Sequence, residues 1–338
     1  MSRRLAAASL LALLALAVVP AAMADGPMPY TMQEGLGVAL PDGSYRFVAV
    51  GTVGANTTLE RIQIRDGAVR GSFQLLGSWG VPVTTYSEGG DGLAADGRTL
   101  VLGDAMSSYP RTISRFLVFD TKRFRQLRAF FLKGDFAFDA LSPDGSKLYL
   151  IQHTDPNNTQ RYVVRAYDVR AGVLLPGRIA DRAQKGWVMQ GYPMARATSA
   201  GGRWVYTLYQ NPGGYPFVHA LDTVRGVAHC VGLPWHGNQN GFYNMRLSLR
   251  HHDRSLAVHW LSGRRWLRVD TRTWAVAADR GAGLPWLAIG SGAAAVLLGG
   301  AALLLARRRR RSAELEQGLA QLLRTDSEKR GTQTVPAA

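Results

Sequence analysis

Short apolar runs that end in an aspartate recur along the chain. The five runs are Ile62–Asp66, Phe116–Asp120, Val164–Asp168, Val218–Asp222 and Trp266–Asp270. Successive aspartates are 54, 48, 54 and 48 residues apart. An aspartate carboxylate accepts the backbone N–H group two residues further on and thereby closes a tight turn. The pattern therefore predicts a strand followed by a turn in every repeat.

A second turn signal precedes each of these aspartates. The five turns are Asp42-Gly43-Ser44, Asp96-Gly97-Arg98, Asp144-Gly145-Ser146, Gly201-Gly202-Arg203 and the degenerate His252-Asp253-Arg254. Asp-Gly between apolar runs is a strong hairpin signal, because glycine adopts positive φ at little cost. The stretches that follow, such as Lys147–Ile151 and Arg203–Leu208, have the composition of strands.

Each repeat thus predicts strand A, a tight turn, strand B, a longer loop, strand C, an aspartate turn and strand D. Four antiparallel strands within a repeat of 48 to 54 residues have the size of a propeller blade. The sequences Leu141–Leu150 and Tyr167–Gly172 resemble the YVTN and WD40-like β-propeller repeats. The prediction is an all-β propeller of about five four-stranded blades in residues 25–283. Two β-sandwiches, the alternative, give no reason for the regular spacing.

The N-terminal residues 1–24 have the features of a secretory signal peptide. Arg3 and Arg4 precede an apolar stretch, and Ala22-Met23-Ala24 is a small-x-small cleavage site. An uncleaved anchor is the alternative, but the apolar stretch is short for a membrane span.

The C-terminal part contains a second apolar run, residues 284–306, without a charged residue. It has the length of a transmembrane helix and is followed by Arg307–Arg311. Because basic residues stay on the cytoplasmic side, we expect a single-pass cell-membrane protein with 25–283 outside the cell and the tail 307–338 in the cytoplasm. A wall-sorting signal at Leu284-Pro285-Trp286 is disfavoured, because the Thr and Gly of that motif are missing.

The longer connections, among them Gly77–Gly92 between two blades, all lie at one end of the predicted blades, and elaborated loops on a rigid scaffold commonly carry function. They contain aromatic and amide side chains, which suit stacking on sugars and hydrogen bonding to peptides. The alternative is that several of the aromatic residues fill the space between blades. The candidate ligand-binding residues are Trp79, Tyr86, Tyr109, His153, Asp155, Trp187, Tyr192, Tyr209, Trp235, His236, Asn238, Asn240 and Tyr243.

Catalytic and metal-binding signals are weak in this sequence. No HExxH, GxSxG or EF-hand pattern occurs, and we expect no metal and no cofactor. A propeller-fold hydrolase acting on glycans is the alternative function, because such enzymes use paired carboxylates. Its candidate catalytic residues are Glu88, Asp104 and Asp135.

Composition and charge narrow the class of partner. The 46% of apolar residues excludes a disordered chain, and the one cysteine, Cys230, excludes a disulfide scaffold. Residues 25–283 carry 26 Arg and 4 Lys against 17 Asp and 3 Glu. Outside a cell, this positive balance favours an anionic wall polymer, an acidic glycan or a lipid surface, and export argues against nucleic acid. The prediction is a membrane-anchored binding module for a glycan, wall polymer or protein.

Overall fold

The computed structural model describes residues 30–279, apart from 86–88, 107–108, 182, 184–188 and 236–237. This part of the chain is built from strands, with one short 3-10 helix, η1 (Asn240–Asn244). The predicted signal peptide, apolar span 284–306 and tail lie outside the described residues. Within the described ranges, no helix has the length and apolarity needed to cross a membrane.

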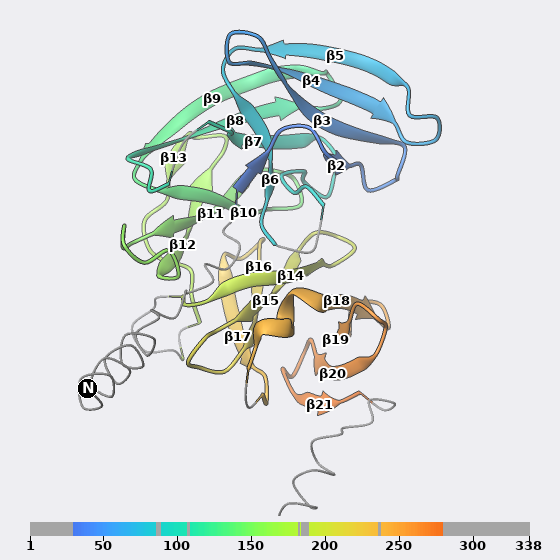
Figure 1. Ribbon diagram of the computed structural model, residues 1–338, viewed down its shortest axis with the longest axis vertical. Coiled ribbons are helices and arrows are strands. Elements are labelled where there is room, and N and C mark those ends of the chain that lie inside the picture. Colours follow the sequence, from blue (N-terminus) through green and yellow to red (C-terminus); the bar gives the residue numbers. More distant parts are fainter. Residues whose placement is uncertain are drawn as a thin grey trace, which may run out of the picture. The chain divides into compact units, whose positions relative to one another are not determined.

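The strands form five antiparallel sheets, each a run of four strands that are consecutive in the sequence (Figure 1). The first sheet contains β2 (Val38–Ala39), β3 (Tyr45–Thr52), β4 (Asn56–Gln63) and β5 (Val69–Leu75). The second contains β6 (Trp79–Val83), β7 (Thr99–Asp104), β8 (Ile113–Asp120) and β9 (Arg125–Lys133). The third contains β10 (Phe136–Leu141), β11 (Lys147–His153), β12 (Tyr162–Asp168) and β13 (Val173–Leu174). The fourth contains β14 (Tyr192–Thr198), β15 (Trp204–Gln210), β16 (Phe217–Asp222) and β17 (Val227–Gly232). The fifth contains β18 (Met245–Arg250), β19 (Ser255–Trp260), β20 (Arg265–Asp270) and β21 (Val276–Ala278).

These five sheets are the blades of a β-propeller repeat, and the predicted order of strands within each is confirmed. The second sheet differs from the prediction in one turn, because residues 84–98 join its first two strands in place of a tight turn. The degenerate turn of the fifth sheet is also a hairpin. There His251, His252 and Asp253 adopt φ values of 55°, 55° and 63° in place of a glycine. The carboxylate of Asp253 accepts the backbone N–H of Ala200 at 3.0 Å, which ties this turn to the fourth sheet.

In the second and fourth sheets, the recurring aspartate connects the two turns at the same end of the sheet. In the fourth sheet, Asp222 Oδ1 accepts the backbone N–H groups of Val224 and Arg225, both at 3.0 Å. Its Oδ2 accepts from Arg203 Nη2 at 2.7 Å. The next residue, Thr223, donates its hydroxyl to the backbone oxygen of Gly202 at 3.0 Å. This arrangement explains why an Asp-Thr pair recurs along the chain.

Acid is expected to weaken this turn, because the folded pKa of Asp222 is lowered. Burial alone would raise this pKa, but the hydrogen bonds from Arg203 and from the two backbone N–H groups outweigh it. Stability from a depressed pKa is complete above the unfolded value and is lost as the pH falls through the folded one. Asp222→Asn keeps a side-chain oxygen that can accept the two backbone N–H groups but removes the charge. In urea unfolding at successive pH values, the variant should lose less stability on acidification than the wild type. An identical pH dependence would contradict this role.

A fifth strand, β1 (Tyr30–Met32), extends the second sheet by pairing with β6, with Tyr30 opposite Val83. Next to β1, the Gln33 amide donates to Ser78 Oγ and to the backbone oxygen of Trp79, both at 3.1 Å. It also donates to Thr57 of the first sheet at 3.3 Å. The N-terminal strand therefore joins the first two sheets.

Hydrophobic clusters join neighbouring sheets in chain order. Phe47 and Leu59 of the first sheet pack with Leu102 and Phe119 of the second. Further clusters join the second sheet to the third and the third to the fourth. The core thus lies between the sheets.

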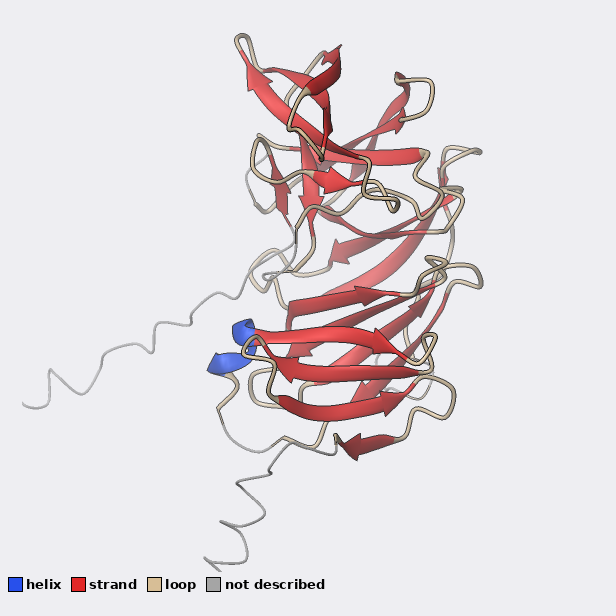
Figure 2. Ribbon diagram, turned by 90° about the vertical axis from the view of Figure 1, so that its right-hand side faces the viewer, coloured by secondary structure: helices blue, strands red, loops and turns tan. Residues whose placement is uncertain are grey.

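Most of the longer connections lie at the end of the strands opposite the aspartate turns, where η1 also lies (Figure 2). The exception is residues 84–98, which join β6 to β7 at the aspartate-turn end. One predicted connection is wrong in detail. Gly77–Gly92 was expected to be a loop between sheets, but it contains β6. Only Trp79 and Gly80 of β6 pair with β7, and the extra length falls after it, in residues 84–98. The glycine and the proline in Trp79–Val83 hide the strand from a composition-based reading.

Candidate functional site

Three of the sequence candidates are core residues. Trp79, Tyr192 and Tyr209 are 7%, 4% and 1% exposed. The Trp79 ring donates its N–H to the backbone oxygen of Leu76 at 2.7 Å, and Tyr209 stacks on Phe217 with ring centroids 5.0 Å apart. These three aromatic side chains pack within the core, as the packing alternative predicts.

Four other candidates, Tyr86, Glu88, Trp187 and His236, lie outside the described residues. The remaining candidates fall into two groups on the loop end of the sheets. One group surrounds Tyr109 and His153, and the other surrounds Trp235.

The first group, here named the Tyr109 cluster, consists of Tyr109, Arg111, Asp135, His153 and Asp155. Tyr109 and Arg111 belong to the loop between β7 and β8, and Asp135 to the connection from β9 to β10. Antiparallel pairing of β10 with β11 brings Asp135 beside His153, whose backbone N–H donates to the Asp135 backbone oxygen at 3.0 Å. Residues from two sheets therefore meet at one point.

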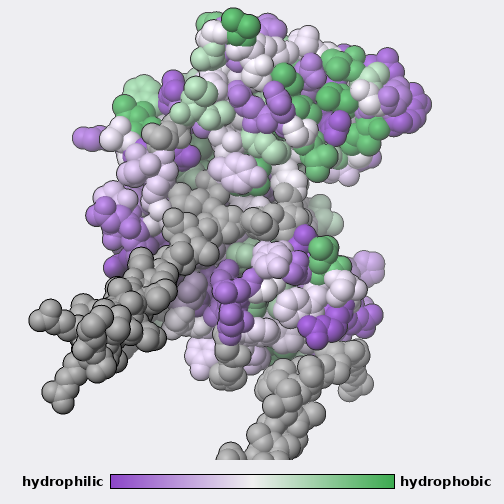
Figure 3. Space-filling view, in the orientation of Figure 1, coloured by the Kyte–Doolittle hydropathy of each residue, from purple (hydrophilic) through white to green (hydrophobic). Residues whose placement is uncertain are grey.

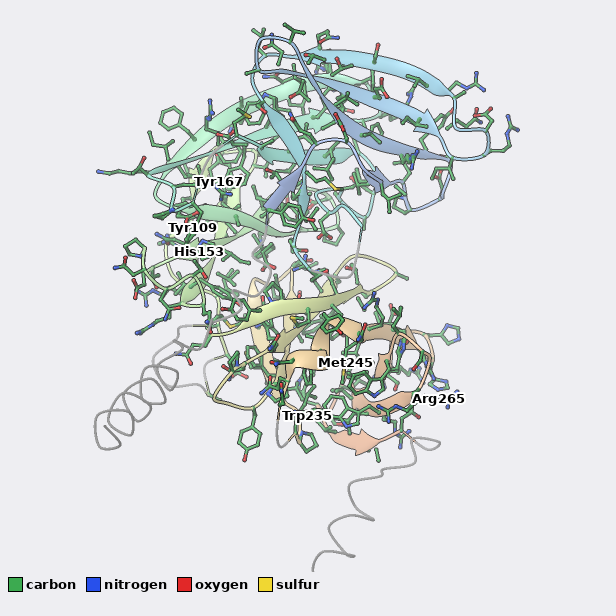
Figure 4. The ribbon with its side chains drawn as sticks, viewed as in Figure 1. Tyr109, His153, Tyr167, Trp235, Met245 and Arg265 are labelled. Carbon is green, nitrogen blue, oxygen red and sulfur yellow. The ribbon has the colours of Figure 1, made fainter. Side chains whose placement is uncertain are left out.

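The Asp135 carboxylate lies at the centre of this cluster. Its Oδ1 is 3.4 Å from Arg111 Nη1 and 3.5 Å from His153 Nδ1. Arg111 Nη1 also donates to the Phe136 backbone oxygen at 2.9 Å. The rings of Tyr109 and His153 meet edge to face, with centroids 5.4 Å apart (Figure 4). One carboxylate thus contacts both an arginine and a histidine beneath an aromatic ring.

Three buried polar atoms of the cluster have no hydrogen-bond partner among the described residues. They are the Tyr109 hydroxyl, Asp135 Oδ2 and His153 Nδ1. The His153 and Asp135 side chains are only 3% and 7% exposed. Buried polar groups in proteins are nearly always hydrogen-bonded. Thirteen buried side-chain atoms lack a hydrogen-bond partner in the described part of the chain, and three of them meet here at the loop end, which makes this cluster the candidate binding site.

The surroundings of Tyr109 keep its phenol protonated. Burial, followed by the negative charges of Asp135 and Asp155, raises its pKa to about 12, and Arg111 opposes the shift. Tyr109 is therefore a hydrogen-bond donor at physiological pH, whereas Asp135 Oδ2 is an acceptor. Together they suit a ligand that carries hydroxyl or amide groups.

Trp235 belongs to the second group and packs within an aromatic cluster. Its ring meets Phe242 and Trp266 edge to face, each with centroids 5.1 Å apart, and it is half-buried. Asn238, Asn240 and Tyr243 nearby are exposed.

Gln239, between Asn238 and Asn240, has a structural role that the sequence did not reveal. It accepts the backbone N–H of Asn211 at 2.9 Å and donates to the backbone oxygens of Asn211 and Gly214 at 3.0 and 2.8 Å. It therefore holds the loop between β15 and β16 in place.

Asp104, a catalytic candidate in the hydrolase alternative, is used for structure. Its Oδ1 accepts the backbone N–H of Met106 at 3.0 Å, and Arg115 Nε donates to its Oδ2 at 2.7 Å. Of the two carboxylates of that alternative that the structure describes, Asp104 and Asp135, only Asp135 has an oxygen that lacks a partner. Within the described ranges, no three His, Cys, Asp or Glu side chains come close enough to hold a metal ion.

Arg111 is a site residue that was not among the sequence candidates. It lies two residues after Tyr109, in a connection longer than a blade needs, and this position is the signal that points to it.

Comparison with known proteins finds distant structural likenesses. No protein-family model and no curated protein matches the sequence. The solved structures that resemble it include Kuenenia stuttgartiensis hydrazine synthase, at 16% identity and a TM-score of 0.38, covering 73% of this chain and 77% of that one. They also include the Swd1 β-propeller domain of Myceliophteria thermophila, at 10% identity and a TM-score of 0.41, covering 74% and 71%. TolB from Acinetobacter baumannii is 14% identical with a TM-score of 0.36, covering 74% and 56%. Likenesses this distant carry no information about the ligand of this chain.

Proposed function

We propose that the chain is a membrane-anchored extracytoplasmic β-propeller that binds a glycan, a cell-wall polymer or a protein partner through the Tyr109 cluster. The observation that supports this most directly is the group of three unpartnered buried atoms, the Tyr109 hydroxyl, Asp135 Oδ2 and His153 Nδ1. They lie at the end of the sheets that carries most of the longer connections.

The chemistry of the cluster favours a ligand rich in hydroxyl or amide groups. Asp135 Oδ2 would accept a hydrogen bond from the ligand, and the Tyr109 phenol would donate one. The Tyr109 ring offers an apolar surface of the kind on which sugars stack. The net positive charge of residues 25–283 would hold anionic parts of the same polymer.

The anchor in this proposal is the apolar run 284–306. Its length and the arginines that follow it, Arg307–Arg311, support a single span with the C-terminus in the cytoplasm. The signal-like residues 1–24 support export of the propeller.

Binding to isolated peptidoglycan by the full-length chain in lipid nanodiscs would test the ligand site. Tyr109→Phe removes one hydroxyl and keeps the ring, so the Kd should rise roughly tenfold, as expected for a lost hydrogen bond in a desolvated site. Tyr30→Phe, at a half-exposed tyrosine on β1, is the matched control and should bind as the wild type does.

Equal binding by both variants, with unchanged unfolding curves, would place the site elsewhere. Release of soluble reducing sugars by the wild type, abolished in Asp135→Asn, would favour the hydrolase alternative over a binding module.

A further inference from the structure

The loop end of the fifth sheet carries a group of arginines beside exposed apolar side chains, here named the basic rim: Arg246, Leu261, Arg264, Arg265 and Tyr243. The connection from β19 to β20 contains Leu261 and Arg264, and its Leu261 backbone N–H donates to the Asn244 backbone oxygen at 2.6 Å. This bond holds the connection against the end of η1. The rim is therefore a fixed surface.

The rim is open to solvent. Leu261 is 61% and Tyr243 is 49% exposed, and residues 261–265 are all exposed. In Figure 3, hydrophilic groups lie over the sheet β18–β21 beside a small hydrophobic patch. Exposed leucine and tyrosine among arginines are typical of a surface that rests on lipid headgroups.

The guanidinium groups of the rim are held in place but are little neutralised. Arg264 lies over the Trp260 ring, 4.9 Å from its centroid, and Arg246 donates to the Met245 backbone oxygen at 2.8 Å. Among the described residues, only Arg265 of the three arginines has a carboxylate within 4 Å, that of Asp279 at 3.9 Å. Residues 245–279 contain seven Arg and three Asp, with no Lys or Glu. The fifth sheet is therefore strongly positive.

The chain leaves this sheet next to the rim. β21 pairs antiparallel with β20, and the Asp279 backbone N–H donates to the Trp266 backbone oxygen at 3.1 Å. Trp266 is the neighbour of Arg265, which Figure 4 labels together with Met245 on the fifth sheet. The exit of the chain and the start of β20 thus lie at the same end of the sheet.

Chain length then limits how far the rim can be from a membrane. The apolar run begins at residue 284, five residues after Asp279. Five extended residues span at most about 18 Å. One headgroup layer accounts for roughly 5–8 Å of that distance, since a bilayer with both headgroup layers is roughly 10–15 Å thicker than its hydrocarbon core. The exit of the chain therefore lies at most roughly 13 Å from the headgroups, which is little more than the Debye length of about 8–10 Å.

We propose that the basic rim binds anionic phospholipid headgroups of the bilayer that holds the chain. This inference rests on the membrane anchor of the proposed function. The arginines would donate charge-assisted hydrogen bonds to lipid phosphates, and Leu261 and Tyr243 would enter the interfacial layer. The contact would hold the fifth sheet down on the membrane and leave the Tyr109 cluster, at the second and third sheets, for its own ligand.

The test uses full-length chain in vesicles with a fluorophore on Ser262→Cys, in a Cys230→Ala background, and headgroup-linked quenchers. Quenching should be stronger in phosphatidylcholine vesicles that contain phosphatidylglycerol than in phosphatidylcholine alone, and high salt should reduce it. A triple variant removes the charges of the rim: Arg246→Gln, Arg264→Gln and Arg265→Gln. The equilibrium constant between the lipid-bound and the free rim, obtained from the quenching, should fall by about fivefold for each charge removed.

The matched control removes three exposed arginines from the aspartate turns at the opposite end of the sheets, Arg170→Gln, Arg225→Gln and Arg272→Gln. Quenching should stay as in the wild type. Equal quenching in both vesicle types, or equal loss in the two triple variants, would overturn the proposal.

Alkaline carbonate extraction separates this proposal from the one on which it rests. If the chain stays in the vesicles while quenching ignores lipid charge, the anchor stands and the rim proposal fails. If carbonate strips the chain from the vesicles, the anchor itself is wrong.

Discussion

Arg196→Met is expected to destabilise the propeller by about 3–5 kcal/mol, the usual cost of leaving one charge of a buried ion pair alone. Arg196 lies on β14 and is 7% exposed. Its Nη2 is 2.7 Å from Asp139 Oδ1 of the third sheet, and its Nε is 3.2 Å from Thr207 Oγ1. Its Nη1 also donates to the Asp139 backbone oxygen and lies 3.9 Å from Asp91 Oδ1.

The electrostatics of this pair give the sign of the effect. Burial alone would lower the pKa of Arg196, but the charges of Asp91 and Asp139 outweigh it and raise the pKa. The guanidinium is therefore the counter-ion of two carboxylates, and its removal leaves Asp139 buried without a partner.

Urea unfolding of the variant measures the loss, and a double variant provides the control. Arg196→Met with Asp139→Leu removes both charges, so it should recover much of the stability that the single variant loses. A single variant within about 1 kcal/mol of the wild type would show that the pair contributes no more than a surface salt bridge does.

Gly145→Val should cost roughly 2–5 kcal/mol, from about 1–2 kcal/mol of left-handed backbone strain and about 1–3 kcal/mol of overpacking. Gly145 adopts a φ of 67° in the turn between β10 and β11. A Cβ there would collide with the side chain of Thr99 on the second sheet. Backbone strain and the collision with Thr99 contribute separately to the loss of stability. The same substitution at a glycine with similar φ but no close neighbour measures the backbone contribution alone.

Gly43 is that control, because it occupies the same Asp-Gly-Ser turn in the first sheet. Its φ is 70°, and a Cβ there would meet nothing within 4 Å. Gly43→Val should therefore show the backbone cost alone. Thermal or urea unfolding of both variants measures the difference, and equal losses would show that the Thr99 contact relaxes freely.

The repeat could be predicted because its signals are local. Asp144-Gly145 forms its turn from neighbouring residues, and the Asp222 carboxylate bonds N–H groups two and three residues away. Such chemistry is visible in the sequence whatever the rest of the chain does.

Contacts between repeats have no such signature. Arg111 meets Asp135 across 24 residues, and Arg196 meets Asp139 across 57. The burial of Tyr192 and Tyr209 likewise depends on which sheet packs over them. The Tyr109 cluster was therefore predicted only in pieces: Tyr109, His153 and Asp155 as ligand residues, and Asp135 under another function.

The pairing of β1 with β6 limits the order in which the first strands can pair during synthesis. Residues 30–32 are synthesised first, but their partners at 81–83 emerge only after the whole first sheet has been made. The first sheet consists of strands that are neighbours in the sequence, so it can form while β1 still waits. Since Gln33 bonds both Thr57 and the Trp79 backbone, the completed β1–β6 pair closes the first two sheets into one cooperative folding unit. A chain that ends before residue 81 therefore lacks the strand on which residues 30–32 pair.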